Sequence, residues 1–109
     1  MKKLLAAGLL IFSTSAALAA SHTVNMKSIS FDPKKLTIKV GDTVEWKNLS
    51  YTPHSATSDD STAKDSSFDT GLIEPKKTTK KVTFSKPGTF MYHCSIHGRA
   101  MTATVEVQP

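Results

Sequence analysis

The residues best suited to do chemistry lie in one stretch, residues 92–101, which reads YHCSIHGRAM. It contains Cys94, the only cysteine of the chain, followed by His97 and then by Met101 in the spacing C-x2-H-x3-M. A thiolate, an imidazole and a thioether form a soft donor set. Such a set favours copper over magnesium or calcium, because those harder ions prefer oxygen ligands.

A copper site of this kind needs a second histidine, since the blue-copper arrangement combines one cysteine, two histidines and a weakly bound methionine. His93 immediately precedes Cys94, so strand alternation points it to the opposite face. His22 lies near the N-terminus of the predicted mature chain. His54 follows the predicted strand that contains Trp46, where a loop can meet the Cys94 loop at one end of a β-sandwich. We therefore predict His54 as the second histidine ligand.

Each of these residues also has an ordinary structural role. A buried cysteine is commonly a small apolar filler, a methionine at a strand start usually belongs to the core, and a loop histidine is usually solvated. Zinc is the competing metal, but a thioether is a poor zinc ligand and closed zinc sites use more cysteine and histidine. The coincidence of all four residues predicts one copper ion bound by His54, Cys94, His97 and Met101.

Alternating apolar and polar side chains reveal the strands that must position these residues. Residues 36–40 and 43–47 alternate on either side of Gly41-Asp42, which predicts two half-buried strands joined by a tight turn. Further inward-facing positions are predicted at Val82, Phe84, Phe90, Tyr92, Cys94, Ala103, Val105 and Val107.

The remaining pattern also indicates an all-β chain. Residues 55–69 are polar and predict an exposed connection with at most one short edge strand, and no useful window repeats at 3.6 residues. Several short strands separated by turns predict a Greek-key two-sheet β-sandwich of about seven to eight strands. We expect one such domain over residues 20–109, with no second domain.

The N-terminus has the three-part pattern of a secretory signal peptide. Met1-Lys2-Lys3 is basic, residues 4–12 are apolar, and Ala17-Leu18-Ala19 forms an A-x-A cleavage site. A membrane-anchoring helix is the alternative, but the apolar run is shorter than the ~20 residues of a span. We predict that residues 1–19 are cleaved and that the protein is periplasmic. A lone cysteine in an exported domain has no disulfide partner there, which again suits a metal ligand.

The charge is mildly basic. The chain carries +5, and removal of Lys2 and Lys3 leaves +3 for residues 20–109. No arginine-rich stripe or set of interleaved aromatic residues suggests nucleic-acid binding. The charge suits an acidic protein partner, and ordinary solubilising lysines explain it equally well. A basic cluster is interpreted as a solvated edge and comprises Lys76, Lys77, Lys80 and Lys81.

Taken together, these segments resemble the cupredoxins, specifically the small bacterial plastocyanin- and amicyanin-like blue copper proteins. The resemblance spans the predicted mature domain and rests on Phe31-Asp32-Pro33, residues 36–48, Pro53-His54, residues 68–72, residues 86–90, residues 92–97 and residues 101–105.

The resemblance implies a cupredoxin-like fold with three strong ligands, His54, Cys94 and His97, and a weak axial ligand, Met101. Two features depart from the family pattern. Three residues separate His97 from Met101, one more than in amicyanins and one fewer than in plastocyanins. Ser55 stands where these proteins usually have an asparagine that helps to tie the two ligand loops together.

The predicted function is one-electron transfer through Cu(I) and Cu(II) by an exported monomer, not by an enzyme. Redox proteins such as a dehydrogenase, a reductase or a cytochrome would dock near His97, at a small patch framed by Pro53, Gly98 and Ala100. The alternative is a copper-binding or delivery protein without a dedicated electron-transfer partner, and a small copper oxidase or reductase is a weaker third hypothesis.

The predicted mature N-terminus suggests a second metal site. Cleavage after Ala19 would leave Ala20-Ser21-His22, whose amine, two amide nitrogens and imidazole could surround Cu(II) or Ni(II) in a square plane.

Overall fold

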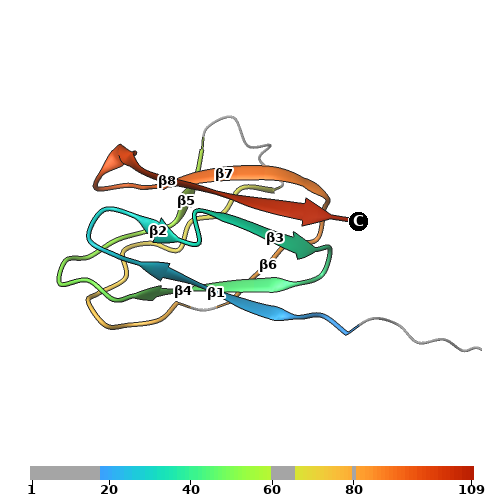
Figure 1. Cartoon of the computed structure of the whole chain (residues 1–109), viewed down its shortest axis with the longest axis horizontal. Helices are drawn as coiled ribbons and strands as arrows, with labels where there is room; N and C mark the ends of the chain where they lie inside the picture. The colour runs from blue at the N-terminus through green and yellow to red at the C-terminus, as the bar shows by residue number, and fades with distance from the viewer. Residues whose placement is uncertain (1–17, 60–65, 80) are drawn as a thin grey trace, which may run out of the picture.

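Two four-stranded sheets face each other in the computed structural model, which describes residues 18–59, 66–79 and 81–109 (Figure 1). The predicted signal peptide, residues 1–19, lies outside these residues except for its last two positions. The strands are β1 (Ser21–Met26), β2 (Phe31–Asp32), β3 (Lys35–Lys39), β4 (Thr43–Asn48), β5 (Thr57–Ser58), β6 (Val82–Thr83), β7 (Gly88–Cys94) and β8 (Gly98–Gln108).

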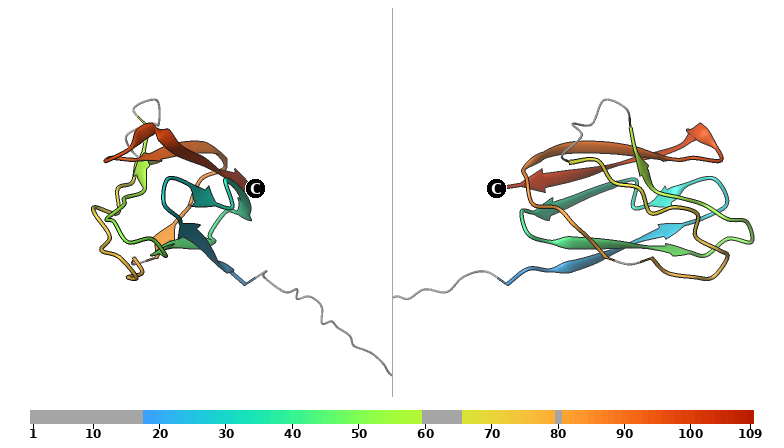
Figure 2. Two further views of the ribbon diagram at one scale, coloured as in Figure 1. Left: turned by 60° about the vertical axis from the view of Figure 1, so that its left-hand side comes forward. Right: turned by 180° about the vertical axis from the view of Figure 1, so that it is seen from behind.

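The first sheet has the order β2-β1-β4-β6 and the second the order β3-β8-β7-β5, and the two layers are seen from two sides in Figure 2. β1 is parallel to β4 and β3 is parallel to β8, whereas the other pairs are antiparallel. The predicted all-β sandwich is confirmed. Within the described ranges, no helix is long and apolar enough to span a membrane.

The two strands predicted at residues 36–40 and 43–47 form as β3 and β4 on either side of the turn, but they do not pair with each other. The turn forms, with Gly41 at a φ of 95°, but the chain crosses there from one sheet to the other. Leu36 of β3 lies opposite Val105 of β8, while Trp46 of β4 lies opposite Val24 of β1. Both strands therefore bury one face in the same core from opposite layers. Alternation reports which side chains face inward, and it does not report which strand is the neighbour.

An aromatic cluster fills the core between the two sheets. Trp46 and Tyr92 are essentially fully buried, and the Trp46 indole N–H donates a hydrogen bond of 3.2 Å to the Tyr92 hydroxyl oxygen. Phe31 packs edge-on against Tyr92 at 4.7 Å between ring centroids. Burial also raises the pKa of Tyr92. The tyrosine thus stays neutral, and its hydrogen bond with Trp46 joins β7 to β4 close to the end of β7 where Cys94 lies.

The polar connection at residues 55–69 is predicted to be exposed, but Ser55 and Ala56 at its start are buried. Its described part carries one short edge strand, β5, within the predicted limit of at most one. β5 pairs with β7, with Thr57 opposite His93. Just before β5, an isolated antiparallel bridge joins His54 to Ile73. This bridge fixes the backbone of His54 at the end of the sandwich where β7 ends.

Candidate metal centre

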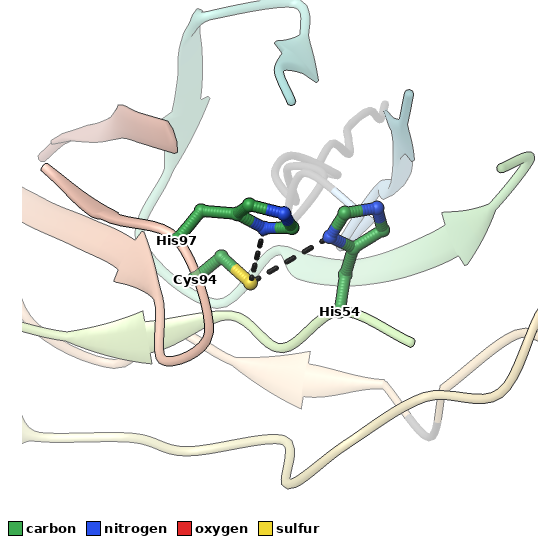
Figure 3. Close-up of side chains that lie close together, drawn as sticks. All are labelled: His54, Cys94 and His97. Carbon is green, nitrogen blue, oxygen red and sulfur yellow. Dashed lines mark hydrogen bonds between the residues drawn. The ribbon is translucent and has the colours of Figure 1, made fainter. Parts of the chain in front are cut away.

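Three of the four predicted ligands converge at one end of the sandwich (Figure 3). Cys94 Sγ lies 3.6 Å from His54 Nδ1 and 3.6 Å from His97 Nδ1. The two imidazole rings are 5.0 Å apart between centroids. One donor atom from each residue lies within 4.8 Å of the others, so a single ion could contact all three.

The β7–β8 hairpin places Cys94 and His97. Cys94 is the last residue of β7 and faces inward like Phe90 and Tyr92, as the alternation predicted. His97 ends the turn that follows, and Gly98 pairs with Cys94 at the start of β8. Gly98 has a φ of 56°, a left-handed conformation that glycine adopts without strain. The chain can therefore reverse directly after His97 and leave its ring beside Cys94.

The loop of His54 is fixed by hydrogen bonds on both sides. His54 and Ile73 exchange two backbone bonds, with N–O distances of 3.2 and 2.7 Å. The buried Asn48 amide donates to the carbonyls of Thr52 and Ile73 at 2.8 and 2.9 Å. Asn48 therefore connects the two segments that flank His54, a role that the sequence did not reveal.

The His54 side chain is fully buried and held at both ring nitrogens. Nδ1 faces Cys94 Sγ, while Nε2 lies 3.4 Å from Thr52 Oγ1. Burial lowers the pKa of His54, and the charge of nearby His97 lowers it further. A neutral imidazole can bind a metal through one ring nitrogen, here Nδ1 on the side of Cys94, while a hydrogen-bond partner at the other nitrogen orients the ring.

Ser55 links the two ligand loops directly. The Ser95 backbone N–H donates to Ser55 Oγ at 2.9 Å, and Ser55 Oγ donates to Ser95 Oγ at 3.0 Å. Ser55 Oγ also lies 2.9 Å from Thr57 Oγ1, and Ser55 is 1% exposed. Two small serines thus tie the loops where an asparagine was expected from the family pattern. Ser95 gave no signal in the sequence, because nothing indicated that the two serines would meet.

Met101 lies within a strand and not at its start. β8 begins at Gly98, so the three residues between His97 and Met101 belong to the strand. Met101 is 1% exposed and shares its inward phase with Ala103. Thr102 pairs with His93, so Met101 is the next residue along β8 toward the Cys94 end of the ladder. Its place is compatible with the predicted axial role, which stays a prediction.

The donor distances fit one metal ion. A thiolate about 2.3 Å and an imidazole about 2.0 Å from the same ion, at a tetrahedral angle, lie roughly 3.5 Å apart. Both Sγ–Nδ1 distances in the structure are 3.6 Å. Thiolate and imidazole donors suit copper or zinc, and a buried thioether beside them favours copper.

The other two histidines lie elsewhere. His93 Nδ1 is 2.7 Å from Asp59 Oδ1, half-buried and outside the site, as predicted. His22 Nε2 is 3.0 Å from Asp42 Oδ2. Backbone N–H donation from Ala20, the hydrogen bond with His22 and backbone N–H donation from Lys39 lower the Asp42 pKa to about 2.

Comparisons with known proteins agree with this geometry. A family model described as copper binding proteins of the plastocyanin/azurin family matches residues 18–108. Plastocyanin from Nostoc punctiforme is 32% identical over 90% of this chain and 81% of the relative. A reduced proline-to-phenylalanine variant of amicyanin aligns with a TM-score of 0.72 and 26% identity, over 81% of this chain and 82% of the other. A copper-containing nitrite reductase from Thermus scotoductus aligns with a TM-score of 0.74 and 30% identity, over 92% of this chain and 25% of the enzyme.

Proposed function

The chain belongs to the copper-binding plastocyanin/azurin family, and from this membership we propose that it is an exported type I copper protein that carries single electrons between redox proteins. The observation that carries the proposal is the buried meeting of His54, Cys94 and His97, with both Sγ–Nδ1 distances at 3.6 Å. Amicyanin, which is similar in structure, is known in oxidised and reduced states.

The four predicted ligands divide into strong and weak donors. Cys94 would bind copper as a thiolate and His54 and His97 would bind through Nδ1, while the Met101 thioether would be the weak fourth donor. A copper ion held there supplies a one-electron couple between Cu(I) and Cu(II). The Ser55–Ser95 hydrogen bonds hold the two ligand loops together and so restrain the donors. Restrained donors keep the structural change between the two oxidation states small.

His97 is the route by which electrons enter and leave. His54 and Cys94 are fully buried, whereas His97 is only partly buried, so its ring lies nearest to solvent among the three. Pro53, Gly98 and Ala100 frame the predicted patch, and Ile96 is 52% exposed close by in the chain. A small apolar patch suits the brief contacts of redox partners. The exposed Arg99 favours a partner with an acidic rim.

The named relatives favour a carrier over an enzyme. Plastocyanin and amicyanin are the proteins to which the chain is similar over most of its length. The chain also corresponds to about a quarter of the similar nitrite reductase, so that enzyme's activity does not transfer to it. The signal-peptide pattern of residues 1–19 supports a periplasmic location, and we expect the carrier to act as a monomer.

One set of measurements tests the proposal. Purified protein with one equivalent of Cu(II) should show the intense visible absorption of a copper–thiolate bond, lose it on reduction and regain it on reoxidation. Cys94→Ser should abolish the band, and Asp59→Asn, which changes the His93–Asp59 pair outside the site, should retain it. A colourless Cu(II) protein would contradict the carrier. Rapid loss of copper to a mild chelator would instead favour copper delivery.

A further inference from the structure

A second group of metal-binding atoms lies at the end of the sandwich opposite the metal centre. There β1 begins beside the turn between β3 and β4, while the β7–β8 turn lies at the other end (Figure 1). The Ala20 backbone nitrogen is 2.9 Å from Asp42 Oδ1, and His22 Nε2 is 3.0 Å from Asp42 Oδ2. One carboxylate therefore holds a nitrogen from each of two residues at the start of the chain's first strand.

The sheet fixes this arrangement. Ser21 pairs with Thr43 in the parallel β1–β4 ladder, and the Thr43 N–H donates to the Ala20 carbonyl at 3.0 Å. The Lys39 N–H donates to Asp42 Oδ2 at 3.1 Å, which holds the carboxylate on the turn. The inference depends on the predicted cleavage after Ala19, because this cut converts the Ala20 nitrogen into a primary amine that already contacts Asp42.

We propose that the mature N-terminus forms a second metal site, in which the Ala20 amine, the His22 imidazole and the Asp42 carboxylate bind one Cu(II) ion. Two donors about 2.0 Å from an ion at a right angle lie roughly 2.8 Å apart. The Ala20 nitrogen lies 2.9 Å from Asp42 Oδ1 and the His22 nitrogen lies 3.0 Å from Asp42 Oδ2, so each nitrogen has a carboxylate oxygen close to the spacing of adjacent ligands. Two nitrogen donors and one oxygen donor favour Cu(II) over the other divalent metals of the first transition row.

The site is open to ions from solvent. A cavity of about 340 Å³ adjoins it, lined by Leu18, Ala20, His22, Ile38, Asp42 and Gln108 among others. The His22 side chain is 26% exposed and that of Asp42 is 9% exposed, so the imidazole is accessible while the carboxylate is shielded. Cleavage after Ala19 removes Leu18 from the lining and widens the approach to the amine.

This site differs from the square-planar chelate suggested by the sequence Ala20-Ser21-His22. That chelate uses the amide nitrogens of Ser21 and His22, which lie within β1, and must draw the first residues of β1 out of the sheet. The proposed site leaves β1 in place and requires Asp42, which the chelate does not. Asp42 therefore separates the two arrangements.

Copper titration of the mature protein tests the proposal. Protein exported with its own leader is first checked by mass spectrometry for an N-terminus at Ala20, and its Cys94 site is filled with one copper. Further Cu(II) is then added against a competing chelator and followed by electron paramagnetic resonance. We expect one additional equivalent, bound about tenfold or more weakly after Asp42→Asn or His22→Gln. Asp59→Asn is the matched control, since the His93–Asp59 pair lacks an amine, and it should bind as wild type does.

A variant with one extra residue before Ala20 keeps both side chains but moves the amine, and it should lose the second copper. The copper–thiolate absorption of the first site reports that each variant is folded, so failure of the second site is distinguishable from failure of the carrier function. Three results would overturn the proposal: a mature N-terminus other than Ala20, no second equivalent of Cu(II), or undiminished binding by Asp42→Asn.

Discussion

Replacing Ser55 with alanine should loosen the contact between the two ligand loops. Ser55 Oγ accepts the Ser95 N–H at 2.9 Å, donates to Ser95 Oγ at 3.0 Å and lies 2.9 Å from Thr57 Oγ1, and all three contacts are lost in the variant. Each such hydrogen bond contributes about 0.5–1.5 kcal/mol, and Ser55 is 1% exposed, so water cannot replace its hydroxyl without rearrangement. We expect the free energy of unfolding of the metal-free protein to fall by about 1.5–4.5 kcal/mol.

Urea unfolding measures the loss of stability. At a slope of about 1–2 kcal/mol per molar urea, a loss of about 2 kcal/mol lowers the midpoint by roughly 1–2 M. Ser58→Ala is a control, because Ser58 Oγ likewise joins two segments of the chain, accepting the Phe68 N–H at 2.9 Å and donating to the Phe68 carbonyl at 3.0 Å. That pair of bonds lies outside the ligand loops.

Copper release distinguishes the two serine variants. If the Ser55–Ser95 bonds keep the loops closed around the ion, Ser55→Ala should transfer copper to a chelator roughly tenfold faster, since about 1.4 kcal/mol corresponds to a factor of ten. Ser58→Ala should lower stability and leave the transfer rate near that of wild type. Equal transfer rates for the two variants would refute the role assigned to Ser55.

Three further predictions concern other parts of the fold. Met101→Ala should keep a coloured copper site with a shifted reduction potential, and an unchanged potential in voltammetry would exclude the axial role. Because Met101 is 1% exposed, the same variant should destabilise the metal-free chain by about 2–5 kcal/mol. Gly98→Ala should lower the free energy of unfolding, measured in urea, by about 1 kcal/mol, because Gly98 has a φ of 56°. The added methyl group meets nothing within 4 Å, so the loss comes from the backbone alone. Unaltered stability would argue against that backbone conformation. The Asp42 pKa is lowered from 3.8 to about 2, so the stability that ionised Asp42 contributes is complete above about pH 4 and is lost as the pH falls to about 2. Asp42→Asn should remove the loss of stability between these pH values in acid unfolding. An acid-unfolding curve identical to that of wild type would show that Asp42 is not responsible.

Much of the fold follows from local patterns in the sequence. A period of two identifies the inward face of a strand, and the burial of Tyr92, Cys94, Ala103 and Val105 agrees with it. The types and spacing of the donors also predicted the metal, because soft ligands select copper whatever the fold around them. These properties depend on residue type and on neighbours a few positions away.

The partners of each strand and loop depend on the tertiary structure. The alternation in β3 and β4 is compatible with a hairpin and with two strands in opposite sheets. The second arrangement is selected because the apolar face of each strand packs against the same core from opposite sides. The Ser55–Ser95 bonds and the His22–Asp42 contact join positions 40 and 20 residues apart, so no local pattern indicates them. The sequence by itself determined which atoms could bind a metal. The β7–β8 hairpin and the loop bridge between His54 and Ile73 decided that His97 and His54 lie 3.6 Å from the Cys94 sulfur. The β1–β4 ladder decided that Ala20 and His22 meet at Asp42.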